Sequence, residues 1–262
     1  MDFNSYEFKE FIDFGCNRQK FIQDFLQKNE IECPVISLEN KNHIYVKFPQ
    51  TQYSPLFKIK TVVAHYDRVA NSPGANDNSA AVFCLLNWAV KLFNRKSFHN
   101  VRLIFTDGEE LAEQGVSSQG AFALAAFFKK LCIDDDVFVF DCMGRGDVPV
   151  LAETVLPKKI SASFVKKFVV LEKRAENLIK SAGGGKWFCL PCNYSDNAGF
   201  IANGIPAVAF TLLPSNEVSD VLKNKTPKTW QLLHSPFDNF ESLWQNSFDL
   251  TMKILDFLAE MK

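Results

Sequence analysis

The chain has 262 residues and a mass of 29.7 kDa, a length that accommodates a sizeable hydrophobic core in one or two domains. Hydrophobic residues make up 47% of it and charged residues 23%, which is the composition of a folded globular protein rather than a disordered one. With 29 Lys and Arg against 30 Asp and Glu, the net charge is −1, so neither nucleic acid nor an anionic membrane is expected as a partner.

The predicted elements begin with helices. Residues 1–7 lack the basic start and the apolar core of a secretory signal. Apolar side chains then recur at helical spacing over residues 6–26, which predicts one helix or a helix pair in an N-terminal helical segment of residues 1–34. Short strands are predicted at 35–38 and 43–48, and the turn residues between them indicate an antiparallel hairpin.

Strands and helices alternate over the rest of the chain. The strands are predicted at 57–64, 101–105, 137–140 and 207–212, and the helices at 78–93, 121–131, 163–182, 197–202 and 239–261. We therefore predict a single α/β domain over residues 1–262, with a mostly parallel mixed sheet flanked by helices on both faces and the hairpin near one edge. No apolar stretch approaches the roughly 18 residues that would suggest a membrane span.

The cysteine content indicates the compartment. Seven cysteines are scattered along a chain without an export signal, and this odd number favours reduced thiols in the cytoplasm.

Side chains that can bind metal follow the predicted strands, at the points where those strands end. They are His65 and Asp67 after one strand, Glu109 and Glu110 after the next, Asp141 after a third, Asp77 in a loop before a helix, and His234 after the last strand. In open α/β sheets, ligands bind beyond the carboxyl ends of the strands, so these five segments are expected to meet at one edge.

Each of these residues also has an ordinary explanation. A histidine after a strand is usually a solvated loop residue, Asp77 could cap the following helix, and Asp141 could be a loop carboxylate without a role. The combination favours a metal site, because histidine followed two residues later by a carboxylate is typical of a ligand held by its neighbour. Nitrogen and oxygen donors without cysteine suit a catalytic zinc site.

The ordered motifs resemble those of the M28 zinc aminopeptidases, from about residue 35 to the C-terminus. The matching segments are His65-Tyr66-Asp67, residues 74–79, Gly108-Glu109-Glu110, Gly115 with Ser117 and Ser118, Asp141, Ser195-Asp196, and residues 234–238. The resemblance implies a phosphorylase/hydrolase-like fold with the site above the strand ends. It also implies hydrolysis of peptides that have a free N-terminus.

The resemblance further implies two Zn²⁺ ions in each chain. Asp77 would bridge them, and the peptide bond from Asp77 to Asn78 would be cis. His65 and Asp141 would complete the site of one ion, and Glu110 and His234 the site of the other.

Two further residues receive roles from the resemblance. Glu109 would be the general base that takes a proton from water and returns it to the leaving amine. Asp67 would hold the imidazole ring of His65 from behind.

Some positions depart from the family pattern. Ser79, Ala80 and Ala81 stand where the family usually has a glycine. The loop 183–197, expected to form part of the substrate pocket, is unfamiliar and contains Cys189 and Cys192. A single pair of this spacing favours two thiols or a small disulfide that shapes the loop over a redox or metal role.

Three functions remain open. The first is a zinc aminopeptidase, and the second is an acyltransferase similar to the glutaminyl cyclases, which hold one zinc ion at the counterparts of Asp77, Glu110 and His234. Cyclases commonly have tryptophan where this chain has Leu233, and they usually lack the asparagine found here at Asn78, so both positions favour the peptidase. The third is an inactive peptidase-like binding protein, which would have no need for a general base. The sequence does not indicate the oligomeric state.

Overall fold

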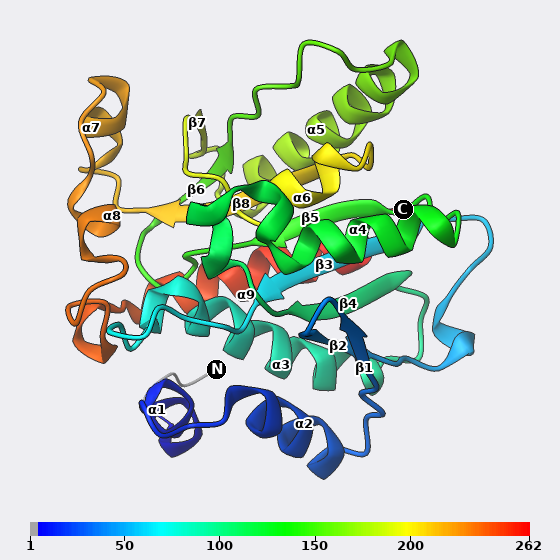
Figure 1. The fold of residues 1–262 in the computed structure, drawn as a ribbon, viewed down its shortest axis with the longest axis horizontal. Coiled ribbons are helices and arrows are strands. Elements are labelled where there is room, and N and C mark those ends of the chain that lie inside the picture. The colour runs from blue at the N-terminus through cyan, green and yellow to red at the C-terminus, as the bar shows by residue number, and fades with distance from the viewer. Residues whose placement is uncertain (1–4) are drawn as a thin grey trace.

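An eight-stranded mixed sheet runs through the middle of the part of the chain that the computed structural model describes, residues 5–262 (Figure 1). The strands are β1 (Val35–Leu38), β2 (Lys41–Val46), β3 (Lys60–His65), β4 (Val101–Thr106), β5 (Asp136–Phe140), β6 (Val148–Ala152), β7 (Phe188–Leu190) and β8 (Ala207–Leu213). Their order across the sheet is β1-β2-β4-β3-β5-β8-β6-β7. Strands β4, β3, β5 and β8 run parallel, and the antiparallel pairs lie toward the edges, which confirms the predicted mixed sheet and its edge hairpin.

Helices cover both faces of this sheet. They are α1 (Tyr6–Ile12), α2 (Arg18–Lys28), α3 (Ala80–Phe93), α4 (Gly120–Lys130), α5 (Ala162–Ala182), α6 (Asn197–Ala202), α7 (Val218–Leu222), α8 (Lys228–Leu232) and α9 (Gln245–Glu260). On one face, α9 packs between α3 and α5, and on the other, α4 packs against α6. Helices α1 and α2 form a further layer beneath α3 (Figure 1).

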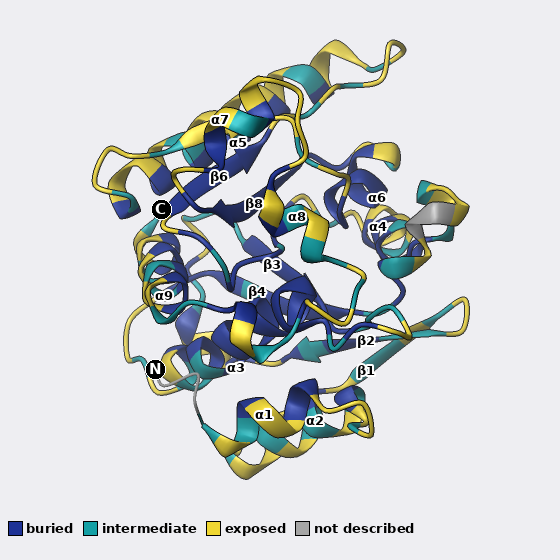
Figure 2. Cartoon of the chain, turned by 90° about the vertical axis from the view of Figure 1, so that its left-hand side faces the viewer, coloured by how far each residue is buried: buried dark blue, intermediate teal, exposed yellow. Residues whose placement is uncertain are grey.

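The central strands are buried on both faces, as their continuous apolar sequences predict (Figure 2). Phenylalanine fills much of the space between the layers. Phe8 of α1 packs edge-on against Phe83 of α3, with ring centroids 5.1 Å apart, and against Phe248 of α9 at 5.7 Å. The N-terminal helices therefore share the core of the α/β unit.

Several elements differ from the sequence-based prediction. Helices α7 and α8 were not predicted, and further differences lie in β6, β7 and α9. Strand β6 contains Pro149, whose missing N–H argues against a central strand; it is tolerated because β7 pairs only from Val150 onward. Strand β7 is only three residues long and lies in the segment 183–197, which the sequence predicted as a loop. The last helix begins at Gln245 instead of 239, because Phe240–Ser242 forms a separate 3₁₀ turn.

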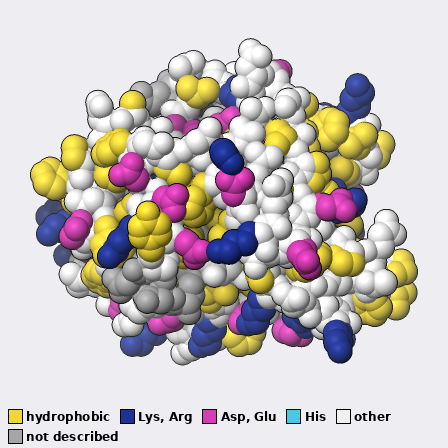
Figure 3. Space-filling view, turned by 90° about the horizontal axis from the view of Figure 1, so that it is seen from below, with side chains coloured by type: hydrophobic (Ala, Val, Ile, Leu, Met, Phe, Trp, Pro, Cys, Tyr) yellow, Lys and Arg dark blue, Asp and Glu magenta, His cyan; other side chains and the backbone are white. Residues whose placement is uncertain are grey.

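The surface seen from the side of α1 and α2 carries acidic and basic side chains interspersed among polar and apolar ones (Figure 3). This distribution agrees with the near-zero net charge of the chain. Among residues 5–262, no helix has the length and the apolar character needed to cross a bilayer.

Candidate active site

The candidate site lies where the connections of the sheet change direction. The chain leaves β3 through α3 and returns in the neighbouring β4, and it then crosses by way of α4 to β5, on the other side of β3. Loops that leave adjacent strands toward opposite faces open a crevice at the carboxyl ends of those strands. His65 ends β3 and Asp141 follows β5 directly, so both side chains enter this crevice.

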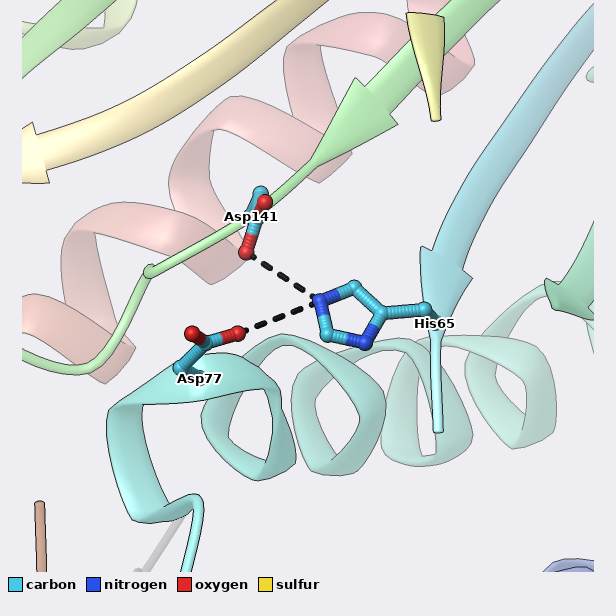
Figure 4. Close-up of side chains that lie close together, drawn as sticks. All are labelled: His65, Asp77 and Asp141. Carbon is cyan, nitrogen blue, oxygen red and sulfur yellow. Dashed lines mark ion pairs between the residues drawn. The ribbon is translucent and has the colours of Figure 1, made fainter. Parts of the chain in front are cut away.

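The first group of potential ligands surrounds the imidazole ring of His65. Its Nε2 atom lies 3.2 Å from Oδ1 of Asp77 and 3.5 Å from Oδ1 of Asp141 (Figure 4). The ring is fully buried. The three side chains come from the end of β3, the segment before α3 and the end of β5, and they point toward a common centre.

The second group surrounds His234 on the other side of Asp77. The Nε2 atom of His234 lies 3.1 Å from Oε2 of Glu110 and 3.2 Å from Oδ2 of Asp77. The His234 side chain is 49% exposed, so this group lies at the mouth of the crevice. Asp77 thus offers one carboxylate oxygen to each group.

The loop that carries Asp77 is held from two sides. Asp238 accepts hydrogen bonds from the backbone N–H groups of Asn76 (2.8 Å) and Asp77 (3.1 Å). On the other side, the Asn78 side chain donates to the backbone oxygen of Phe140 (2.8 Å) and accepts from the N–H of Cys142 (3.2 Å). The bond between Asp77 and Asn78 is cis, as the resemblance implied.

The two adjacent glutamates point to different places. The carboxylate of Asp67 accepts hydrogen bonds from the N–H groups of Glu109 (3.2 Å) and Glu110 (3.0 Å), and its Oδ1 lies 3.5 Å from Nδ1 of His65. Glu110 faces His234, whereas Glu109 is buried and belongs to neither ligand group. The Gln119 amide donates to Oε1 of Glu109 at 3.0 Å.

A glycine allows Gln119 to reach Glu109. A Cβ atom at Gly120 would lie 1.8 Å from the carbonyl oxygen of Asp107, so only glycine permits the start of α4 to pack this closely on the loop after β4. The N–H of Gly120 donates to the oxygen of Gly108 across this contact.

The site concentrates buried carboxyl groups, and burial raises the pKa values of several of them. Desolvation raises the pKa of Glu109 well above its usual range. It also raises the pKa of Asp196 to about 7 and that of Asp238 to about 7. Conversely, the carboxylates of Asp77 and Glu110 raise the pKa of His234 to about 11. So many carboxyl groups in one crevice favour the binding of cations.

The spacing of these donors fits zinc. Two atoms that lie about 2.1 Å from a tetrahedral zinc ion are about 3.4 Å from each other, and the four nitrogen–oxygen distances above span 3.1–3.5 Å. Within residues 5–262, neither ring nitrogen of His65 has a hydrogen-bond partner, nor do Oε1 of Glu110 and Oδ1 of Asp141. Buried polar atoms without partners are costly unless something else binds them. The structure therefore brings all five predicted ligands into two groups suited to metal.

A cavity of about 550 Å³ opens from these ligands. It is lined by the carboxylates and His234 and also by less polar side chains that include Phe210, Trp230 and Leu233. Residues 192–195 of the expected pocket loop line its wall, and Cys192 and Cys189 of this loop are free thiols.

Several supporting residues were missed at the level of sequence. Asp196 accepts a hydrogen bond from the Thr106 hydroxyl, and like Asp238 it lies in a motif that had been recognised but had no role assigned. Gln119 and Arg18 carried no signal, because each acts through contacts distant in sequence.

A family model described as "Peptidase family M28" matches residues 44–258. No curated protein matches the sequence.

Solved structures of low sequence identity share the fold. LapA aminopeptidase from Legionella pneumophila aligns with a TM-score of 0.68 at 13% identity, covering 95% of this chain and 66% of that one. Glutaminyl cyclase from Porphyromonas gingivalis aligns with a TM-score of 0.65 at 16% identity, covering 99% of both chains. BSAP, a zinc aminopeptidase from Bacillus subtilis, aligns with a TM-score of 0.58 at 19% identity, covering 84% of this chain and 49% of that one.

Proposed function

Because the chain belongs to peptidase family M28, we propose that it is a zinc-dependent aminopeptidase that removes N-terminal residues from peptides. The observation that carries this proposal is the arrangement around Asp77. One of its carboxylate oxygens faces His65 and Asp141, and the other faces Glu110 and His234. A carboxylate placed between two groups of ligands is the arrangement expected of a bridge between two ions.

Metal binding is the first role of the site residues. His65, Asp77, Asp141, Glu110 and His234 would hold two Zn²⁺ ions. When bound, the ions would act as Lewis acids on the peptide carbonyl and would lower the pKa of water.

Glu109 would be the general base. Since Gln119 occupies its Oε1 atom, Oε2 is the atom that would take a proton from water and pass it to the leaving amine. Asp67 would orient His65, and at the same time it fixes the backbone of both glutamates.

The cavity suits the end of a peptide. Its carboxylates would attract the positive charge of a free N-terminus, and its less polar wall would accept a side chain. A cytoplasmic location stays a prediction from the cysteine content of the sequence.

Glutaminyl cyclisation is the second candidate function. It is favoured by one observation: the cyclase from P. gingivalis aligns with a TM-score of 0.65, close to the 0.68 of LapA aminopeptidase. Against it stand the two ligand groups that share Asp77 and the residues Asn78 and Leu233, where the sequence departs from the pattern of cyclases.

Metal content and reaction products distinguish these functions. The purified protein is saturated with zinc, its zinc is counted by elemental analysis, and it is given aminoacyl amides and N-terminal glutaminyl peptides. We expect close to two zinc ions per chain and the release of free N-terminal amino acids. One zinc ion, with ammonia released from glutaminyl peptides and no cleavage, would instead establish a cyclase. Bound zinc without turnover of either substrate class would indicate a binding protein.

A further inference from the structure

Arg18 links the N-terminal helices to the candidate metal site. It is the first residue of α2 and lies outside residues 44–258, which the family model matches. Although arginine is seldom fully buried, only 6% of this residue is exposed. Its guanidinium group contacts the segment that follows β3 and the loop that leads to Asp77. Helix α2 itself lies beneath α3 (Figure 1).

The guanidinium group binds two backbone segments at once. Nη1 donates to the carbonyl oxygens of Tyr66 (3.0 Å) and Asp67 (3.3 Å), directly after His65. Nη2 donates to the carbonyl oxygens of Pro73 (2.7 Å) and Gly74 (3.4 Å), in the loop that leads to Asp77.

A fifth contact lies just beyond Asp77. Nη2 of Arg18 also donates to the hydroxyl oxygen of Ser79, at 2.7 Å. The hydroxyl group of Ser79 in turn donates to the carbonyl oxygen of Gly74. The residues on either side of Asp77 are therefore bonded to each other, and both contact the guanidinium group.

This environment is unusual for a buried cation. Among residues 5–262, Arg18 forms no ion pair, and all of its hydrogen-bond partners are neutral oxygens. Burial and the nearby charge of Arg68 lower the pKa of its guanidinium group to about 10, although Asp67 and Asp77 favour the charged form. A buried charge without a paired carboxylate costs stability, which suggests a role beyond packing.

We propose that Arg18 is a positioning residue that holds the His65–Asp67 segment and the Asp77 loop at the separation that zinc binding requires. The inference rests on the proposed function, since it takes His65 and Asp77 as ligands. Arginine is suited to this role because its planar group presents five N–H donors in a fixed geometry, which lysine cannot reproduce. The ring of Phe11 lies 5.0 Å from the guanidinium carbon and supports it from α1.

The close packing of the loop makes it sensitive to this contact. A Cβ atom at Gly74 would lie 2.5 Å from the carbonyl oxygen of Asp77 and 3.3 Å from Nη2 of Arg18. A displaced guanidinium group would remove its hydrogen bonds to the carbonyl oxygens of Pro73 and Gly74, and the Asp77 carboxylate would move with its backbone. Removing residues that orient metal ligands typically costs about 10–100-fold in metal affinity.

The test compares Arg18→Met with Arg68→Met. Arg68 ties the same loop to the N-terminal segment, donating to the carbonyl oxygens of Pro73, Ile12 and Asp13, but it is only partly buried. For each variant, the zinc dissociation constant is measured by competition with a chromogenic chelator, and the thermal midpoint of the zinc-free protein, kcat and KM are measured separately.

We expect Arg18→Met to raise the zinc dissociation constant about 10–100-fold and to lower kcat more than it changes KM. Arg18→Lys, which keeps the charge but not the geometry, should recover only part of the affinity. Arg68→Met should leave zinc affinity within about threefold of wild type, even where its thermal midpoint falls. If Arg18→Met does not fold, Ser79→Ala removes one partner of the guanidinium group and should still weaken zinc binding measurably.

Two results would overturn the inference. One is wild-type zinc affinity in Arg18→Met, or in Ser79→Ala if that variant has to be used. The other is an equal loss of affinity in Arg68→Met, which would mean that general attachment of the N-terminal segment is what matters. Because zinc affinity is measured without substrate, these results leave the reaction type open; a wild-type protein that bound no zinc would overturn the proposed function as well.

Discussion

Replacing Glu109 with glutamine tests the proposed general base most directly. The change removes one negative charge and the ability to accept a proton, yet the amide oxygen of glutamine can still accept the hydrogen bond from Gln119. Since Glu109 belongs to neither ligand group, the zinc content should stay at the wild-type level. Loss of general-base catalysis costs about 10²–10⁴-fold in kcat, which corresponds to about 3–5 kcal/mol of transition-state stabilisation.

The assay measures kcat and KM on an aminoacyl p-nitroanilide, with zinc counted in the same preparation. We expect KM within a few-fold of wild type, because Glu109 is assigned to proton transfer and not to binding. Glu110→Gln is the matched control, and it should lose zinc because Glu110 faces His234. More than a tenth of the wild-type kcat in fully loaded Glu109→Gln would show that another group moves the proton.

Three further predictions concern the metal ligands, Gln119 and His99. His65→Ala and His234→Ala should each lose zinc, whereas His99→Gln should retain it; elemental analysis that found equal zinc in all three would contradict the ligand assignment. Gln119→Met should lower kcat about tenfold through loss of the hydrogen bond to Glu109 with zinc content unchanged, and an unaltered kcat would show that this contact is dispensable. Burial lowers the pKa of His99 to about 4 from its ordinary 6.5, so His99 stays neutral in the fold while it is protonated in the unfolded chain below pH 6.5. Its contribution to the free energy of unfolding should therefore be lost as the pH falls from about 6.5 toward 4, by about 2 kcal/mol at pH 5. Urea unfolding at pH 7.5 and at pH 5 measures this loss, and the free energy of unfolding should differ less between the two pH values in His99→Gln than in the wild type. The same difference in both proteins would refute the assignment.

The contacts of His99 show why its imidazole ring stays neutral in the folded protein. Its Nδ1 atom accepts a hydrogen bond from the N–H of Val101 (3.0 Å), so this nitrogen carries no proton, and its Nε2 atom lies 3.0 Å from Oε1 of Gln52. The rings of Phe48 and Tyr53 pack edge-on against the imidazole. A second proton would have to displace the bond to Val101.

The sequence predicted the parallel centre of the sheet well, because strands buried on both faces are continuous apolar segments. The edge formed by β6 and β7 was predicted less well. Strand β6 is interrupted by Pro149, and β7 has three residues, too few for an alternating pattern to be recognised. Strand β6 depends on pairing with β8, which lies about 60 residues beyond it in the chain, and β7 pairs in turn with β6. Local sequence does not show such pairing.

The candidate site shows the same division. Residues that end parallel strands, such as His65 and Asp141, could be placed at one edge from chain order alone, because that edge is common to the strands. Gln119 and Arg18 could not, since each reaches the site from a segment whose position only the folded chain defines. Asp238 lies in a recognised segment, but its hydrogen bonds to the Asp77 loop were not predicted. Their contacts orient the backbone around the ligands, and composition and spacing contain no information on them.

The two ligand groups that share Asp77 also have a consequence for folding. His65 and His234 are separated by 169 positions in the chain, so ions bound between them would close most of the molecule into a loop. In the unfolded chain these ligands are far apart and compete poorly for zinc, so binding stabilises only the native state. Free zinc at 1,000 times its dissociation constant would add about 4 kcal/mol per ion to the free energy of unfolding. Chelation would remove this contribution, and zinc supply would then determine how long the protein survives heat or proteolysis.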